Sequence, residues 1–335
     1  MVARAHSAAG KTKPLTVADA IESYIEFLET NRKSGREGRY AADAFILPTL
    51  GKVEIDALTT DQIRTWHAKV AKAPARIRTK PGRKQQFKDN SSDPEQARRR
   101  KSSANRILTV LKGALNRAWR DGKVTSDSAW RRVEPFESVE SARIRYLSIA
   151  EATRLINASA PDFRRIVQGA LETGARYGEL CALTVSDFNS DSGTVTIRQS
   201  KAGKPRHVIL TDDGAVFFAS ITAGRAGSEF LFVKENGDSW LPSHQAAPMA
   251  EANARAAIDP PLNFHGLRHT WASLAVMNGV PLLVVAKNLG HTDTRMVEKH
   301  YGHLAPSFVA DAIRAGAPRF PAIQSDNVTP LKNRN

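Results

Sequence analysis

Apolar positions in the first third of the chain repeat at the three- and four-residue spacing of amphipathic helices. Thr16 and Asp19 begin the first such stretch and have the spacing of a capping box, in which two side chains satisfy each other's free backbone groups. The helices expected after it cover about 39–47, a stretch from Thr60, and a stretch from Ser102 or Ser103 to near Gly122. Residues 15–125 are therefore predicted to form an all-helical domain.

The pattern changes in the second half of the chain. Residues 126–145 lack periodicity and are predicted to be a linker, and Ser148 with Glu151 forms a second capping box. Apolar and polar residues then alternate in GTVTIRQ, and RHVIL follows a Lys-Ala-Gly-Lys turn, which predicts a β-hairpin with Lys201 near its tip. We expect a mainly α protein with a small β-sheet, in which a mixed α+β domain at 146–320 follows the helical one. Residues 1–14 and 321–335 are expected to be tails.

One stretch, 72–101, interrupts the helical pattern with an excess of positive charge. It holds eleven Lys and Arg residues against three acids, and apolar residues are sparse. Such a run is either a solvated insertion or a segment that contacts phosphates. We favour DNA contact through a mobile loop. The candidate DNA-binding residues are Arg76, Arg78, Lys80, Arg83, Lys84, Arg98, Arg99, Arg100 and Lys101.

The overall composition supports a polyanionic partner. The chain of 335 residues has 49 Lys and Arg against 34 Asp and Glu, a formal net charge of +15, which favours nucleic acid binding. The single cysteine excludes internal disulfides and cysteine-rich zinc modules. No apolar run approaches the roughly 18 residues of a membrane span, and MVARAHSAAGKTKP lacks the apolar core of a signal peptide. We expect a cytoplasmic protein with no membrane association.

Three polar clusters in the second half could carry chemistry. In ETGARYGELCAL, Arg176 follows one helix and precedes another, where it could hold an anion or simply pair with Glu179. Lys201 on a hairpin turn is by itself most often a solvated surface lysine. In LGHTDTRMVEKHYGHL, His291 follows a helix-ending glycine, and Tyr301 alone would be half-buried packing.

The fourth cluster is HGLRH, in which His265 and His269 stand four residues apart and share a helix face. A zinc site is one interpretation, but Gly266 occupies the place where a zinc hydrolase of the HExxH type needs glutamate. Core packing suits His269, because apolar residues follow it. Core packing does not suit Arg268, since arginine is rarely buried without an anionic partner.

The order of these residues along the chain is more specific than any single cluster. The order is Arg176, Lys201, His265, Arg268, His291 and Tyr301, within GARYGEL, SKAGKPRHVIL, HGLRHTWAS, LGHTDTRM and HYGHL. It resembles the tyrosine recombinase (phage integrase) family. The resemblance covers nearly the whole chain, because LGKVEIDALTTDQIRTW and the long helix after residue 102 resemble the family's helical core-binding domain.

The resemblance implies a site-specific recombinase that cuts and rejoins double-stranded DNA, with Tyr301 attacking a backbone phosphate to leave a 3′-phosphotyrosyl bond. Arg176 and Arg268 would hold the phosphate oxygens, which carry extra negative charge in the transition state. His265 would accept the tyrosine proton, and Lys201 would protonate the leaving 5′-oxygen.

Two further residues have supporting roles in this interpretation. His291 would hydrogen-bond the phosphate, and Glu179 would buttress the site. His269, His300 and His303 are left as structural residues. No metal and no cofactor are expected, because the arginines and the lysine supply the positive charge.

The resemblance also implies partners. Family members act as homo-tetramers on two DNA sites, with an accessory DNA-bending or directionality factor in some systems, and we expect the protein at the nucleoid when bound to DNA. We favour an integrase encoded by a phage or another mobile element. The chain departs from the family in its basic insertion and in TSDSAW where Asn-Pro is often found. There is no room before Leu15 for a separate arm-binding domain, so arm-site binding is not expected.

Three other functions fit parts of the pattern. A non-catalytic DNA-binding regulator on the same scaffold would explain the charge, but not the full set of reactive residues. A zinc-dependent hydrolase would use the histidines and would be sensitive to chelators. A type IB topoisomerase would share the phosphotyrosine chemistry without strand exchange between two sites.

Overall fold

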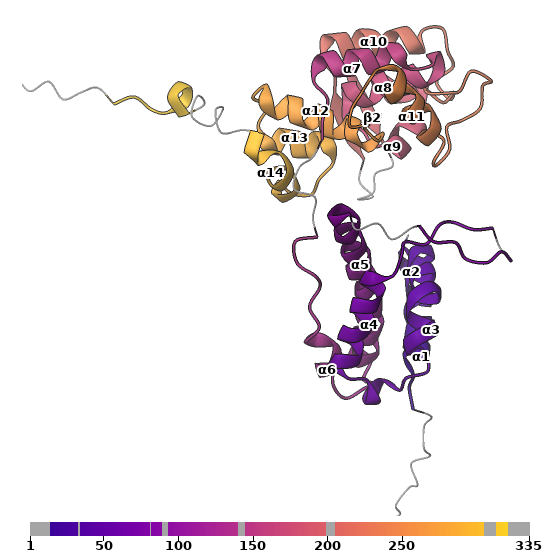
Figure 1. Ribbon diagram of the computed structural model, residues 1–335. Helices are drawn as coiled ribbons and strands as arrows, with labels where there is room; N and C mark the ends of the chain where they lie inside the picture. Colours follow the sequence, from indigo (N-terminus) through magenta and orange to yellow (C-terminus); the bar gives the residue numbers. More distant parts are fainter. Residues whose placement is uncertain are drawn as a thin grey trace, which may run out of the picture. The chain divides into compact units, whose positions relative to one another are not determined.

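The computed structural model describes residues 14–32, 34–80, 82–88, 93–139, 145–198, 205–304 and 313–320 (Figure 1). The chain divides into two compact units, Met1–Ser141 and Ala142–Asn335. Helices dominate both units, and the described residues contain one three-stranded antiparallel sheet. This confirms the predicted fold class. None of the helices in the described ranges combines the length and the apolar character that crossing a membrane requires.

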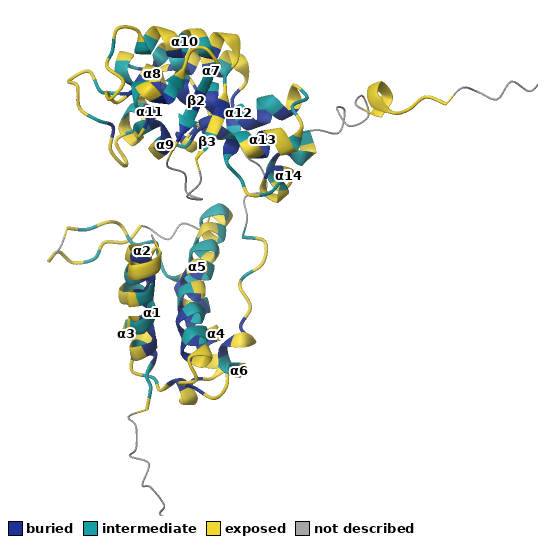
Figure 2. Cartoon of the chain, turned by 180° about the vertical axis from the view of Figure 1, so that it is seen from behind, coloured by how far each residue is buried: buried dark blue, intermediate teal, exposed yellow. Residues whose placement is uncertain are grey.

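The first unit is entirely helical in its main elements. These are α1 (Val17–Asn31), α2 (Gly35–Ala41), a π-helical turn (Ala42–Ile46), α3 (Leu47–Leu50), a 3-10 turn (Ile55–Ala57), α4 (Thr60–Lys72), α5 (Pro94–Arg120) and α6 (Ser128–Arg131). The predicted capping box opens α1: the Asp19 backbone N–H donates to Thr16 Oγ1 at 3.2 Å, and the Thr16 N–H donates to Asp19 Oδ2 at 2.9 Å. Figure 2 shows the buried residues on the faces that α1 and α5 turn toward each other.

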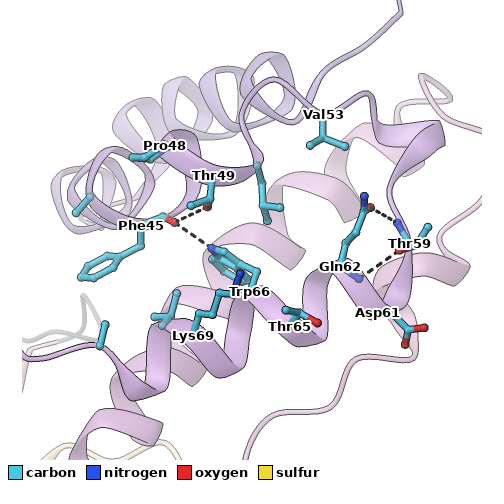
Figure 3. Close-up of a pocket in the computed structure, with 14 residues that line it drawn as sticks. Phe45, Pro48, Thr49, Val53, Thr59, Asp61, Gln62, Thr65, Trp66 and Lys69 are labelled. Carbon is cyan, nitrogen blue, oxygen red and sulfur yellow. Dashed lines mark hydrogen bonds between the residues drawn. The ribbon is translucent and has the colours of Figure 1, made fainter.

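A groove of about 680 Å³ lies beside the π-helical turn of this unit. Figure 3 shows Phe45, Thr49 and Trp66 along it. The Trp66 Nε1–H donates to the Phe45 carbonyl oxygen at 3.0 Å, and the Thr49 hydroxyl reaches the same oxygen at 3.2 Å. The Trp66 bond ties the irregular turn to α4, and the Thr49 bond joins the turn to the following helix α3.

The long helix α5 begins earlier than the sequence pattern suggested. Its N-cap is Asp93, whose carboxylate accepts from the Glu95 N–H at 2.9 Å, and Pro94 occupies the first turn. The prediction of a start at Ser102 or Ser103, and of a loop through residue 101, is therefore wrong. The buried face of α5 starts only at Ala104, so its first turns carry polar and basic residues and lack the apolar signal of a helix.

Before α5, backbone hydrogen bonds pair the two halves of the basic stretch with each other. The Ile77 N–H donates to the Gln86 carbonyl oxygen at 2.9 Å, and the Lys88 N–H donates to the Ala75 carbonyl oxygen at 2.8 Å. We call residues 74–80 and 82–88 the basic hairpin. Figure 1 shows it extending away from the helices of its own unit.

The segment after α5 packs onto the first unit. Trp130 and Val133 are each only 1% exposed, and the Trp130 Nε1–H donates to Asn116 Oδ1 at 2.7 Å. Phe136 stacks on His67 with ring centroids 4.2 Å apart. The first part of the expected linker therefore belongs to the helical core, and the unit ends later than residue 125.

The second unit surrounds a small sheet with helices. Its elements are α7 (Ile149–Ala158), α8 (Pro161–Thr173), α9 (Tyr177–Cys181), a 3-10 turn (Val185–Asp187), β1 (Phe188–Asn189), β2 (Thr194–Ile197), β3 (Arg206–Ile209), α10 (Asp212–Thr222), α11 (Ala246–Arg255), α12 (His265–Met277), α13 (Leu282–Leu289), α14 (Arg295–Tyr301) and a 3-10 turn (Gly302–Leu304). The predicted hairpin is β2–β3, with Val195 opposite Val208. Strand β1 pairs with the other edge of β2, where Phe188 lies opposite Val195.

Candidate active site

Helix α12 carries a buried arginine that no carboxylate of the described chain neutralises. Arg268 is 3% exposed. Its Nη1–H donates to the Gly174 carbonyl oxygen at 2.9 Å, and its Nη2–H donates to the Leu289 carbonyl oxygen at 2.6 Å. Burial, reinforced by the charge of Arg176, lowers the pKa of Arg268 to about 9, which leaves it cationic at neutral pH. The charge of Glu179 raises this pKa, but the hydrogen-bond partners of Arg268 are all neutral, so the buried guanidinium is suited to an incoming anion.

Two glycines place the carbonyl groups that hold this arginine. Gly174 ends α8 with φ of 64°, and Gly290 ends α13 with φ of 71°. Both lie in the left-handed region that side chains with a Cβ rarely adopt. The helices therefore stop sharply at the arginine, and the chain continues directly into Arg176 on one side and His291 on the other.

Arg176 lies at the start of α9 and is both paired and accessible. Its Nη1–H donates to Glu179 Oε1 at 2.9 Å, and its backbone N–H donates to Glu179 Oε2 at the same distance. The side chain keeps 27% of its surface exposed. The pairing with Glu179 is present, and solvent still reaches the guanidinium, so anion binding by Arg176 stays a prediction.

Glu179 is shared with a second arginine that the sequence analysis did not single out. Arg206, at the start of β3, donates from Nη2 to Glu179 Oε2 at 2.7 Å and from Nη1 to Oε1 at 3.1 Å. Its Nε–H donates to the Asn288 carbonyl oxygen at 2.8 Å. Burial raises the pKa of Glu179, but its bonds to Arg206 and to the Arg176 N–H outweigh burial, so the net pKa is lowered. Glu179 is therefore an anion that ties β3 to α9.

His291 contacts the buried arginine directly. Its Nε2 lies 3.1 Å from Arg268 Nη2, and since arginine can only donate, Nε2 accepts. Burial and the charges of Arg268 and Arg176 lower the pKa of His291 to about 4, so the ring is neutral and carries its proton on Nδ1. That nitrogen is buried without a partner among the described residues. A hollow of about 540 Å³ opens beside His291, with Arg176 in its wall.

Tyr301 ends α14 and points into the same cluster. The residue is 3% exposed and belongs to one buried apolar cluster with Ala272 and Val276 of α12. Burial raises its pKa to about 12, although the charge of Arg268 acts in the opposite direction. Its hydroxyl oxygen lies 2.6 Å from His269 Nδ1. The tyrosine is therefore protonated and held by a histidine that the sequence analysis assigned to packing.

His265 lies one turn before His269 on α12. The residue is exposed at the start of the helix, and its ring meets that of His269 edge to face with centroids 4.9 Å apart. Although part of the residue reaches solvent, desolvation by the surrounding protein, then the charges of Arg268 and Arg176, lower the pKa of His265. The structure thus gathers five expected residues, which are Arg176, His265, Arg268, His291 and Tyr301. Glu179 is hydrogen-bonded to Arg176. Lys201 lies outside the described residues.

The candidate DNA-binding residues fall in the first unit and form two groups. Those with exposed side chains include Arg78, Lys80, Arg83 and Lys84 of the basic hairpin. Others have partners within the unit. Arg76 donates to Gln85 Oε1 and the Ala44 carbonyl oxygen, and Arg100 donates to the carbonyl oxygens of Val70 and Ala73. The second group is therefore better suited to anchoring the hairpin and α5.

On α5, Glu95 accepts from both Arg98 and Arg99. Lys101 lies over the Phe136 ring at 5.9 Å. These contacts leave Arg99 and Lys101 exposed on the helix, and Arg98 half-buried. No group of three or more His, Cys, Asp and Glu side chains within the described ranges is arranged to hold a metal ion.

Comparison with known proteins finds a family match within the second unit. Residues 145–307 match the profile of the Phage integrase family. The integrase of Salmonella phage P22 is 29% identical over 221 residues, which cover 62% of this chain and 55% of that protein. The integrase of Escherichia phage 186 is 27% identical over 213 residues, covering 62% of this chain and 58% of that protein. The chain thus spans less than two thirds of the length of these relatives.

Solved structures share the fold over more of the chain. The Tn1549 transposon integrase in complex with a circular intermediate DNA has a TM-score of 0.69 at 15% identity, covering 90% of this chain and 99% of that one. A lambda integrase tetramer bound to a Holliday junction has a TM-score of 0.65 at 18% identity, covering 86% of this chain and 78% of that one.

Proposed function

Because residues 145–307 belong to the phage integrase family, we propose that the protein is a site-specific DNA recombinase that integrates a phage or other mobile element. It would cut and rejoin DNA through a 3′-phosphotyrosyl intermediate. The names of the phage integrases among its relatives support the integrase role. The observation that carries the chemistry is the buried Arg268, which has a tyrosine and two histidines around it and no carboxylate partner in the described chain.

In this proposal the phosphate binds between Arg176 and Arg268. Both guanidinium groups donate to its non-bridging oxygens, which gain negative charge as the pentavalent transition state forms. His291 also contacts the phosphate. Its Nε2 accepts from Arg268 in the free protein, so donation from Nε2 to a phosphate oxygen requires that this nitrogen gain a proton and release its bond to Arg268. The negative phosphate favours that protonation.

Tyr301 is the proposed nucleophile. Its oxygen bonds to phosphorus as the bond to the 5′-oxygen breaks, and His265 accepts the proton that the tyrosine loses. Lys201 is proposed to protonate the leaving 5′-oxygen. The phosphotyrosyl bond keeps the energy of the broken bond, so the 5′-hydroxyl of another strand can reverse the step without ATP. The proposed mechanism assigns no step to a metal or a cofactor.

The first unit would add affinity for double-stranded DNA. Its exposed hairpin residues, Arg78, Lys80, Arg83 and Lys84, are suited to contact phosphates. By analogy with the lambda integrase tetramer on a Holliday junction, four copies would assemble on two sites. An accessory DNA-bending or directionality factor is a further proposed partner. A protein with these activities would work in the cytoplasm, at the nucleoid when bound to DNA.

A covalent-trapping assay tests the proposal. Wild-type protein is incubated with nicked duplexes from the ends of the element that encodes it, in the presence of EDTA, and separated on a denaturing gel. We expect a slowly migrating protein–DNA adduct. An adduct that EDTA abolishes would point to metal-dependent chemistry, and tight binding without an adduct on these ends would contradict the proposal.

A further inference from the structure

The hydroxyl of Tyr301 has a partner that the proposed mechanism does not use. Its oxygen lies 2.6 Å from Nδ1 of His269, a short and direct hydrogen bond across 32 residues of sequence. We propose that His269 is a positioning residue for the nucleophile, which fixes the Tyr301 oxygen relative to the phosphate site. The inference rests on the proposed function, since it deepens the role of that same site.

The position of His269 on α12 supports this role. It follows Arg268 directly, and Arg268 is held in place by two backbone carbonyl groups. Two adjacent residues of α12 would thus fix both reacting partners: His269 holds the nucleophile, and Arg268 binds the phosphate. Holding reacting atoms in a near-attack arrangement removes much of the barrier to a bimolecular step, and misplacement by about 1 Å can cost about 100-fold in rate.

The surroundings of His269 favour positioning over proton transfer. His265 on the same helix, His300 on α14 and the adjacent Arg268 all face it. Burial, with these neighbours, lowers the pKa of His269 to about 4. A neutral ring with so little affinity for a proton can hold the tyrosine without becoming an imidazolium. His265 remains the proposed proton acceptor.

A matched pair of substitutions separates the two roles. Asparagine places an amide oxygen or nitrogen one bond beyond Cγ, where histidine has Nδ1, so His269→Asn can keep the hydrogen bond but cannot act as a base. Leucine has nearly the same shape as asparagine but carries no polar atom, so His269→Leu removes the bond. Both variants are to be compared with the wild type by DNA affinity, by thermal unfolding and by the single-turnover rate of adduct formation across pH 5.5 to 9.

We expect His269→Leu to form adduct about 10- to 100-fold more slowly, with DNA affinity within about 3-fold of wild type. His269→Asn should stay within about 3-fold of the wild-type rate and keep the shape of its pH profile. His300→Leu is the control, because His300 lies beside Tyr301 but has no described hydrogen bond to it; its rate should be unchanged. If His269→Asn forms adduct as slowly as His269→Leu, while both variants fold and bind DNA, the positioning role is overturned.

A measurement on the free protein tests the bond itself. In the full chain labelled with ¹⁵N-histidine, Tyr301→Phe should shift the Nδ1 resonance of His269 and leave that of the exposed His303 unchanged. An unchanged His269 resonance overturns the inference whether or not the protein cleaves DNA. Wild-type adduct that Tyr301→Phe abolishes supports the proposed function independently of either His269 variant. If the wild type forms no adduct, the proposed function fails and the positioning role fails with it.

Discussion

The two units of the chain use positive charge in different ways. In the first unit, the basic hairpin carries Arg78, Lys80, Arg83 and Lys84 as exposed side chains. In the second, Arg268 is almost fully buried and held by neutral carbonyl groups. Exposed charges act by their number, because each neutralised phosphate releases counterions and each contact adds a similar small amount. A buried charge acts by its position, because the surrounding protein excludes water and strengthens its interaction with one bound anion.

The arginines of the second unit sharpen this comparison. The side chain of Arg206 is 9% exposed and Arg268 is 3% exposed, but Arg206 has a bidentate partner in Glu179 and Arg268 has none in the described chain. We therefore assign Arg206 to the structure of the site and Arg268 to the substrate. Arg176 shares the carboxylate and stays accessible, so we propose that it serves both purposes.

Removing the buried charge should have the largest effect. Arg268→Ala is expected to slow adduct formation about 1,000-fold, because one preorganised donor to a charged transition state is commonly worth a factor of about 100 to 1,000. DNA affinity should fall less than about 3-fold, since the exposed residues supply most of it. Single-turnover cleavage measures the rate of adduct formation, and a binding titration measures the DNA affinity. Arg268→Lys, which keeps the charge but loses the fork, should recover only part of the rate.

Breaking the structural pair should lower stability. Glu179→Gln leaves Arg206 buried without its anion, and we expect the free energy of unfolding at pH 7 to fall by about 3 kcal/mol. The lowered pKa of Glu179 means that its contribution is present above the ordinary carboxyl pKa of 4.5 and is lost as pH falls through the folded value. Thermal unfolding of both proteins should therefore converge in acid. A difference that persists unchanged at low pH would contradict the ionic role.

Neutralising the exposed charges should have a smaller, salt-dependent effect. Replacing Arg78, Lys80, Arg83 and Lys84 with Gln is expected to reduce the slope of log affinity against log salt by up to about 4. The rate of adduct formation at saturating DNA should not change. Lys52→Gln, an exposed lysine elsewhere in the unit, is the control. Equal affinity of the variant and wild type at every salt concentration would show that the hairpin does not contact DNA.

The sequence predicted the parts of the fold that depend on local pattern. The capping boxes at Thr16 and Ser148 do open α1 and α7, and the alternation at Val195 and Ile197 does form β2. Strand β1 was missed because two residues carry no periodicity. The start of α5 was misplaced because its first turns bury no apolar residue, although Asp93-Pro94 is itself a recognisable helix start.

The order of the residues along the sequence predicted the members of the site. It could not predict the contacts between them. Nothing local links Arg206 to Glu179, or His269 to Tyr301, since these pairs are 27 and 32 residues apart. The one available signal for His269 was its place four residues after His265, which puts both rings on one face of α12. Burial was the second signal missing from the sequence, because it is burial that keeps His291 and His269 neutral.

The central claim is that Arg268 and Tyr301 form one site for one phosphate. The most direct test is to digest the trapped adduct with nuclease and protease and to locate the nucleotide by mass spectrometry. The account predicts the nucleotide on the peptide containing Tyr301, at a yield that Arg268→Ala reduces to background. A nucleotide found on any other residue, or an undiminished yield with Arg268→Ala, would contradict it.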